Sequence, residues 1–476
     1  MNKYHIDSMS WEINYMARPQ FQFLLALALV FTISIGLIYP PFFNSVLAQP
    51  TIVKDPNLKL ELVAQGLKLP TSMAFLGPND ILVLEKASGT VQRIIDGKIQ
   101  PQPLLQVPVS STSERGMLGI AVAKHNSSGG GSGGSPTPTY VFLYYTKDGG
   151  GGSQTLANVL YRYELSNDQL VNPKLLLNLP ALRGPNHNGG KVVIGPDSNV
   201  YTVIGDLRAH RTQAQNVANG PPVDSTGGIL RVTQDGQPVS NGPLGQDTAA
   251  PLNLYYAYGI RNSFGIDFDP VKGKLWDTEN GPTFGDEINL VEPGFNSGWK
   301  QVQGIWKVNA DKDGPVILTP QDLVDFGGKG KYRAPEFTWY HPDVGPTGIK
   351  FLNSNKLGVQ YQDDMFVGDF HFGNLYHFKL NQNRTELALG GPLASKIAAN
   401  STDYATVRSI VFGHGFGGIT DVQVGPDGYL YVLSLYEGGD NCDPLHPRPC
   451  IRYESSLPGT IFRIEPINTT TPTTAK

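Results

Sequence analysis

One unit recurs along this chain: an apolar strand, a turn such as Gly-Pro-Asp, a second apolar strand and a polar turn into a third. Copies begin at Ser72 (SMAFLGPNDILVLEKASGTVQRI), Gly189 (GGKVVIGPDSNVYTVIGD), Phe264 (FGIDFDPVKGKLWDTENG), Thr420 (TDVQVGPDGYLYVLSL), more loosely at Gly348, and at Gly116 as GMLGIAVAKH with YVFLYYT and NVLYRYEL. The spacing of roughly 45 to 85 residues between these starts is typical of propeller blades, which are four-stranded sheets around an axis. The repeat predicts an all-β fold, a six-bladed β-propeller.

The composition agrees with this prediction. The 476 residues are 16% charged and include 21 Tyr, which suits a turn-rich β protein better than a helical bundle. The formal net charge of -4 gives no basic field, so we expect no nucleic-acid partner. We expect the strand GTIFRIEP from Gly459 to return on the axis side of the chain's start and close the ring, which would hide the sheet edges. The prediction is one propeller domain over residues 49–465 and a flexible Thr-rich tail over residues 466–476.

The N-terminal segment carries an apolar block, FLLALALVFTISIGLIY, over Phe23–Tyr39, which follows Lys3 and Arg18. Val46 and Ala48 stand at the small-residue positions of a cleavage site. The pattern predicts a signal peptide over residues 1–48, cut after Ala48. An uncleaved signal anchor is the alternative, because the block is only slightly shorter than a membrane span. Either way we expect an extracytoplasmic protein, secreted or at the cell surface, with membrane contact only through such an anchor.

Two further features are consistent with export. Cys442 and Cys450 lie in one Pro-rich loop, NCDPLHPRPC, and outside the cell we expect a disulfide there rather than two free thiols. Four Asn-x-Ser/Thr sequons, which permit glycosylation, begin at Asn126, Asn383, Asn400 and Asn468.

Polar residues at the ends of inner strands are the candidates for chemistry, because the loops between blades gather at the axis of a propeller. His187, in RGPNHNGGK, directly precedes an inner strand and is a candidate general base near pH 7; the alternative is an exposed loop histidine. Arg261 and Asn262, in YGIRNSFGIDF, follow two units later. A guanidinium there is suited to stabilise an oxyanion or hold a carboxylate, with the amide orienting it. An inter-blade salt bridge is the alternative.

The segment TENGPTFGDEINLVEPGFNSGW is rich in oxygen ligands. It offers the carboxylates of Glu279, Asp286 and Glu287 and the turn carbonyls of Gly281 and Pro282, a set suited to Ca²⁺, although it does not match an EF-hand. The alternative is a solvated acidic loop. The sequence contains no Gly-rich phosphate loop, GxSxG nucleophile elbow, HExxH or CxxC motif, which leaves redox chemistry with an organic cofactor or a metal-assisted reaction.

These residues resemble the glucose/sorbosone dehydrogenase family, the soluble six-bladed propeller sugar dehydrogenases that use pyrroloquinoline quinone (PQQ). The resemblance runs from about Leu60 to Ile464 and is carried by ERGMLGIAV, NHNGGKVVIGPDSNVYTVIGD, YGIRNSFGIDFDP, ENGPTFGDEINLVEPGFNSGW, VGPTGIKF and DVQVGPDGYLYVL. It implies the same fold, a PQQ cofactor and a sugar substrate.

The resemblance also implies roles for individual residues. His187 matches the family's general base, which takes the proton of the anomeric hydroxyl, and Arg261 and Asn262 match the pair that contacts the quinone oxygens. Calcium would be held partly by carbonyls matching Gly281 and Pro282. The remaining matches are a second calcium near Glu287, with Asp286 and the Ser297 carbonyl as neighbours, and Glu114 in place of a cofactor-contacting glutamine.

This sequence departs from the family where a lysine and two arginines neutralise the three PQQ carboxylates. His371, Gly418 and Thr420 stand in those places, so His371 and Thr420 become candidate cofactor contacts. Each lost charge-assisted contact weakens binding by ~1.5–3 kcal/mol. Losing several of these contacts would weaken PQQ binding by orders of magnitude unless Lys350, Arg333 or another cation compensates.

The leading hypothesis is therefore an exported, Ca²⁺- and PQQ-dependent aldose dehydrogenase that oxidises the anomeric carbon to a lactone and passes electrons to an unidentified acceptor. A second hypothesis is a metal-dependent lactone or ester hydrolase in which Glu114, Asp286 and Glu287 hold Ca²⁺. A third is a non-catalytic surface propeller that binds a glycan or a protein and has lost PQQ.

Overall fold

The computed structural model of the chain describes residues 51–124, 138–150, 156–240, 242–245, 250–305, 307–308, 319–436 and 458–467. The predicted signal segment, the loop with Cys442 and Cys450, and the sequons at Asn126 and Asn468 lie outside the described residues. Asn383 and Asn400 are both exposed. In the part of the chain that is described, no helix is long and apolar enough to cross a membrane.

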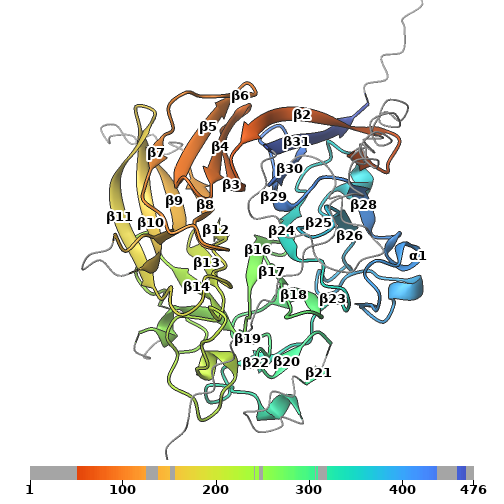
Figure 1. Ribbon diagram of the computed structural model, residues 1–476. Coiled ribbons are helices and arrows are strands. Elements are labelled where there is room, and N and C mark those ends of the chain that lie inside the picture. The colour runs from red at the N-terminus through yellow and green to blue at the C-terminus, as the bar shows by residue number, and fades with distance from the viewer. Residues whose placement is uncertain are drawn as a thin grey trace, which may run out of the picture. The chain divides into compact units, whose positions relative to one another are not determined.

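The fold is all-β and has a propeller arrangement (Figure 1), which confirms the predicted fold class at that level. The described strands form six sheets of four to six strands and one short ribbon. The first sheet has, in spatial order, β3 (Pro70–Gly77), β4 (Asp80–Glu85), β5 (Thr90–Ile95) and β6 (Lys98–Ile99), and β7 (Leu105–Gln106) also pairs with β5. The second has β8 (Met117–Ala123), β9 (Thr139–Lys147), β10 (Ala157–Ser166) and β11 (Gln169–Leu179). The third has β12 (Val192–Ile194), β13 (Val200–Ile204), β14 (Gly228–Val232), β15 (Tyr255–Tyr258), β19 (Phe295–Asn296) and β22 (Lys331–Tyr332).

The other sheets continue the pattern. The fourth has β16 (Ser263–Phe268), β17 (Leu275–Glu279), β18 (Asp286–Val291), β23 (Phe337–Trp339) and β27 (Ile397–Ala398). The fifth has β24 (Pro346–Phe351), β25 (Met365–Asp369), β26 (Leu375–Phe378), β28 (Val411–His414) and β1 (Ile52–Val53). The sixth has β29 (Ile419–Val424), β30 (Leu430–Ser434), β31 (Gly459–Pro466) and β2 (Leu58–Leu67). The ribbon is β20 (Val302–Gln303) with β21 (Lys307–Val308). Helical segments are short: α1 (Tyr404–Val407) and 3₁₀ turns at Gln213–Gln215, Leu252–Leu254, Pro320–Asp322, Val359–Tyr361 and Gly391–Leu393.

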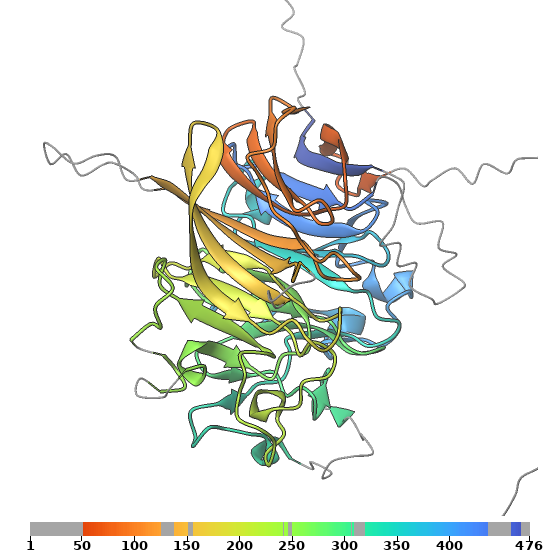
Figure 2. The same ribbon diagram turned by 60° about the vertical axis from the view of Figure 1, so that its left-hand side comes forward.

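Each copy of the repeat forms the inner strands of one sheet. The first strands of the six sheets contact one another in a closed ring, in the order β3, β8, β12, β16, β24, β29 and back to β3. Figure 1 shows these strands at the inner ends of their sheets. In the turned view of Figure 2, neighbouring sheets lie side by side. Apolar residues fill the spaces between neighbouring sheets, as in the cluster that joins Phe142 and Leu160 to Val200 and Leu230.

The ring closes by strand pairing between the two ends of the described chain. Strand β2 pairs with β31 in antiparallel register from Leu58 with Pro466 to Leu67 with Gly459. The expectation that GTIFRIEP returns on the axis side of the chain's start and closes the ring is confirmed, because β31 borders β2 on the side nearer the innermost strand β29. Strand β31 lies between β30 and β2, and β29 holds the inner position, because the repeat unit of Thr420 already supplies the innermost strand.

Candidate active site

A cavity of about 390 Å³ opens at the ends of the inner strands. Loops from all six sheets line it, and most of the predicted cofactor and catalytic residues meet there. These are Glu114, His187, Arg261, Asn262, Gly281, Pro282, His371 and Thr420. Asp286, Glu287 and Ser297 are buried nearby in the same segment of chain but do not line the cavity.

His187 is fixed in place by contacts on both its ring and its backbone. It is 8% exposed and stands five residues before β12 with a φ of 61°. Its Nδ1 lies 2.5 Å from Oδ1 of Asp206, and its backbone N–H donates to Glu114 at 2.6 Å. Because Nδ1 is engaged, Nε2 is the ring nitrogen left to act as a base. The alternative of an exposed loop histidine is wrong.

Asp206 is the partner that sequence reasoning missed. It is fully buried and also accepts hydrogen bonds from Trp299 Nε1 at 2.8 Å and the Arg208 N–H at 2.8 Å. Burial alone would raise the pKa of Asp206, but the hydrogen bond and charge of His187 outweigh it, so this pKa lies below its ordinary value. A signal was present in the sequence: Asp206 ends the strand YTVIGD, and antiparallel pairing of β12 with β13 places the two ends of that hairpin together.

Arg261 and Asn262 connect β15 to β16 on the far side of the ring from β3. The Arg261 guanidinium donates to the Asn280 carbonyl at 2.7 Å and lies over the Trp299 ring, 5.4 Å from its centroid. Arg261 Nε and Asn262 Oδ1 are buried and have no hydrogen-bond partner within the described ranges. Buried polar atoms are nearly always paired, so these two atoms point to a polar occupant of the cavity. The salt-bridge alternative gains no support, since no ion pair of Arg261 occurs in the described part of the chain.

Glu114 ties the base to the Arg-Asn pair. One of its carboxylate oxygens accepts the His187 N–H at 2.6 Å and the Asn262 amide at 3.1 Å, and the other accepts the Asn186 amide at 3.3 Å. Glu114 is therefore a positioning residue, and its carboxylate faces three neutral donors.

Asp286 and Glu287 belong to two different clusters, contrary to the expectation that Asp286 neighbours a calcium at Glu287. Successive residues of a strand face opposite sides. The Asp286 carboxylate accepts the N–H groups of Gly281, Val344 and Gly345 at 2.6–2.9 Å, so it orders the loop that carries Gly281 and Pro282. Burial and the charge of Asp343 raise the pKa of Asp286 to about 6.

Glu287 lies close to two buried carboxylates of β17, those of Asp277 and Glu279. It accepts from Ser297 Oγ at 3.3 Å and from the Gly304 N–H at 2.6 Å, while Ser297 Oγ also donates to Glu279 at 2.6 Å. Burial raises the pKa of Glu287 well above its ordinary value, and the charge of Glu279 adds to this. No three His, Cys, Asp or Glu side chains of the described residues converge as a metal ligand set. The acidic side chains predicted for calcium are therefore not arranged as one site.

The cations around the cavity differ from those expected. Lys350 is paired with Asp267 at 2.9 Å, and Arg333 is paired with Glu336 at 2.7 Å; neither lines the cavity, so both are wrong as compensating cations. Gly418 packs against Phe370 and also lies outside the cavity lining. The cations that line it besides Arg261 are Lys86, Lys191 and Arg208. No sequence pattern marks these three cations, because each comes from a different loop.

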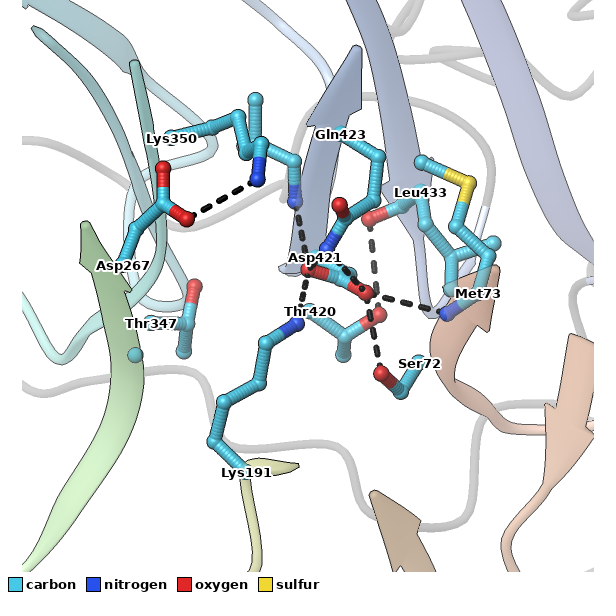
Figure 3. A network of polar contacts seen from close by, with 12 residues as sticks. Ser72, Met73, Lys191, Asp267, Thr347, Lys350, Thr420, Asp421, Gln423 and Leu433 are labelled. Atoms are coloured by element: carbon cyan, nitrogen blue, oxygen red, sulfur yellow. Dashed lines mark hydrogen bonds and ion pairs between the residues drawn. The ribbon is translucent and has the colours of Figure 1, made fainter. Parts of the chain in front are cut away.

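Lys191 is neutralised by the fold itself. Figure 3 shows it reaching Asp421 of β29, with Nζ 2.5 Å from Oδ1, while Lys350 reaches Asp267. Asp421 also accepts Ser72 Oγ and the Met73 N–H, each at 2.9 Å. This network joins three sheets beside the cavity.

Comparison with known proteins identifies the family. The family profile described as glucose/sorbosone dehydrogenase matches residues 67–441. The chain belongs to this family. It is 25% identical to the aldose sugar dehydrogenase YliI of Escherichia coli K12 over 389 residues, 81% of this chain and 92% of that protein. It is 30% identical to quinoprotein glucose dehydrogenase B of Acinetobacter calcoaceticus over 273 residues, 53% of this chain and 54% of the other.

The fold of the family agrees as well. The structure of the PQQ-bound form of aldose sugar dehydrogenase from Streptomyces coelicolor superposes with a TM-score of 0.57 at 22% identity, covering 87% of this chain and 100% of the other. At this identity the likeness shows the fold alone.

Proposed function

We propose that this glucose/sorbosone dehydrogenase family member is a PQQ-dependent aldose dehydrogenase that oxidises the anomeric carbon of a sugar to a lactone. The observation that carries the proposal is the His187–Asp206 pair, at 2.5 Å, in one cavity with Arg261 and Asn262. The relatives support it, because they include an aldose sugar dehydrogenase and a quinoprotein glucose dehydrogenase.

His187 is the base of the proposed reaction. Its Nε2 accepts the proton of the anomeric hydroxyl, and the buried Asp206 carboxylate stabilises the imidazolium that forms. PQQ, when bound, supplies the two-electron acceptor for the hydride of the anomeric C–H bond. Loss of that proton and that hydride converts the hemiacetal carbon to a lactone carbonyl, so the atoms and electrons balance.

The residues present fit the cofactor. Arg261 Nε and Asn262 Oδ1 are buried and unpartnered among the described residues, which matches a ligand that carries both carbonyl oxygens and an N–H group. The Arg261 guanidinium would polarise the quinone oxygens, and Asn262 would orient the ring. The reduced cofactor would need an external electron acceptor.

The finer features are part of the same proposal. We assign the six larger sheets as six blades, since their first strands contact one another in a closed ring. Calcium would bind at the Gly281 and Pro282 carbonyls, on the loop that Asp286 orders. Export by the N-terminal segment, with the cysteine pair as a disulfide, completes the assignment.

The test is reconstitution. The purified protein is incubated with PQQ and Ca²⁺, and dye reduction is measured with D-glucose and other aldoses. We expect aldose-dependent reduction that EDTA abolishes and that His187→Gln lowers by about 10²- to 10⁴-fold. Wild-type protein that binds no PQQ, or His187→Gln with full turnover, would contradict the proposal. The hydrolase hypothesis loses its basis, because Asp286 and Glu287 face opposite sides of β18 and cannot share one metal with Glu114.

A further inference from the structure

We propose that Lys86 binds a carboxylate of the quinone cofactor and so replaces a positive charge that the substituted loops no longer supply. The inference rests on the proposed function and deepens it, because it assigns a cofactor-anchoring residue that the sequence did not indicate.

Lys86 is a buried ammonium at the cavity wall. It directly follows β4, is 7% exposed, and is held by backbone hydrogen bonds from its own N–H to the Leu69 carbonyl and from the Met117 N–H to its carbonyl, both at 3.0 Å. Its Nζ donates to the Ser111 carbonyl at 2.8 Å. An ammonium has three donors, so the cavity side of Lys86 has hydrogen-bonding capacity to spare.

No carboxylate within the described ranges forms an ion pair with Lys86. The acid that attracts it is Glu114, but both Glu114 oxygens already accept N–H groups, from His187, Asn262 and Asn186. A buried charge without a contacting partner is unfavourable unless an anion joins it. Because Lys86 lines the cavity, an anionic group of the occupant would supply the missing partner.

The other cavity cations are occupied differently. Lys191 is committed to Asp421 at 2.5 Å, and Arg208 is exposed, so solvent stabilises its charge. Arg261 bonds to the Asn280 carbonyl and faces the proposed quinone oxygens. Among the cations that line the cavity, Lys86 is thus the buried one without an anionic contact.

The position of Lys86 in the ring suits a cofactor that spans the cavity. In the ring of first strands, β3 and β16 are separated by two strands in either direction, so Lys86 stands across the axis from Arg261. A rigid ligand with its quinone oxygens at Arg261 directs its far end, which carries carboxylates in PQQ, toward Lys86. Thr420 lies on this same wall, since its Oγ1 donates to the Pro70 carbonyl at 3.0 Å and Pro70 pairs with Glu85.

The experiment measures PQQ binding directly. Calorimetry with Ca²⁺ compares the wild type with Lys86→Met, Lys86→Arg and the control Lys272→Met, which removes an exposed cation. We expect Lys86→Met to weaken PQQ binding by roughly 10- to 100-fold, Lys86→Arg to retain most of the affinity and Lys272→Met to change nothing. The trimethyl ester of PQQ, which lacks the carboxylate charges, should bind the wild type and Lys86→Met equally.

Three outcomes separate the explanations. Unchanged PQQ affinity in folded Lys86→Met, checked by near-UV circular dichroism, overturns the inference but leaves the proposed function intact. Absence of PQQ binding by the wild type defeats the proposed function itself. If Lys86→Met binds PQQ normally but raises the KM for a uronic acid and not for glucose, the carboxylate belongs to the sugar and the cofactor assignment is wrong.

Discussion

At the scale of the residue, the proposed base depends on side chains that hold it. Motifs in the repeat units marked His187, Arg261 and Asn262 because each lies at the end of an inner strand. Lys86 was missed for a physical reason: its role depends on which loops converge at the axis, and no spacing within one unit encodes that. Asp206 was missed although its unit carried a signal, because it ends the second strand of the hairpin that His187 precedes. The acidic residues caused the opposite error, because they were predicted to bind calcium. Composition does not show that the Asp286 carboxylate instead accepts hydrogen bonds from backbone N–H groups.

Asp206 offers the first prediction. Asp206→Asn keeps the side-chain shape but removes the charge that stabilises the imidazolium of His187, so we expect kcat for dye reduction to fall on the order of 10²-fold. PQQ affinity should be unchanged. The matched control is Asp224→Asn, since Asp224 bonds His210 at the same 2.5 Å but this histidine does not line the cavity. Equal losses in both variants would show that Asp206 has only a structural role.

Lys86 gives a prediction about stability and pH. Burial lowers the pKa of Lys86 to about 8 from 10.5, although the charge of Glu114 opposes the shift. The unfolded chain therefore binds more protons between these pH values, so the free energy of unfolding rises as pH increases from about 8 to about 10.5 and the cost is fully present below pH 8. For cofactor-free protein at pH 7 we expect Lys86→Met to raise the Tm by on the order of 2 °C.

This gain should shrink at pH 10, where Lys86 is already mostly neutral in the folded state. Differential scanning calorimetry at both pH values measures it, with Lys272→Met as the exposed control. If the Tm of Lys86→Met at pH 7 is lower than that of the wild type, the Lys86 ammonium is stabilised in the folded protein without an anionic ligand.

At the scale of the element, the repeat was readable because its turn has a fixed chemistry. In the turn from Gly195 to Tyr201, Asp197 accepts the Asn199 N–H at 3.1 Å and the Tyr201 hydroxyl at 2.9 Å. The same arrangement recurs in the sheet of β29, where Asp427 accepts the Tyr431 hydroxyl at 2.7 Å. Strands such as β19, β22 and β27 could not be predicted, since they are two residues long and pair in parallel in the outer parts of their sheets without an alternating pattern.

The turn glycine supplies a test at this scale. A Cβ at Gly195 would lie 2.6 Å from Tyr201 Cε2 and 2.7 Å from Asp197 Oδ1, so Gly195→Ala must displace the ring that closes the turn. We expect a loss of about 1–3 kcal/mol in the free energy of unfolding, measured by urea denaturation. Gly390→Ala is the control, because a Cβ there meets nothing within 4 Å. Equal stability of the two variants would contradict this account of the turn.

At the scale of the whole molecule, the cavity exists only while the ring is closed. Its walls come from loops of all six larger sheets. Asp421 of β29 bonds both to Ser72 of β3 and, across the propeller axis, to Lys191. A repeat can indicate the number of units, but it does not say how the last unit joins the first. The pairing of β2 with β31 answers that, and it makes the proposed function depend on strands far from the chemistry.

Closure therefore gives the last prediction. A chain without residues 1–68 loses β2, which leaves the β31 edge unpaired and removes Leu58 and Leu67 from the core. A chain without residues 1–54 loses only the two-residue edge strand β1 and keeps this pairing. We expect the shorter chain to lose cooperative unfolding and PQQ binding, while the longer one retains both, as measured by calorimetry. If the chain without β2 keeps the Tm and the PQQ affinity of the full chain, contacts between β29 and β3 alone hold the ring closed. The cavity would then not depend on the pairing of β2 with β31.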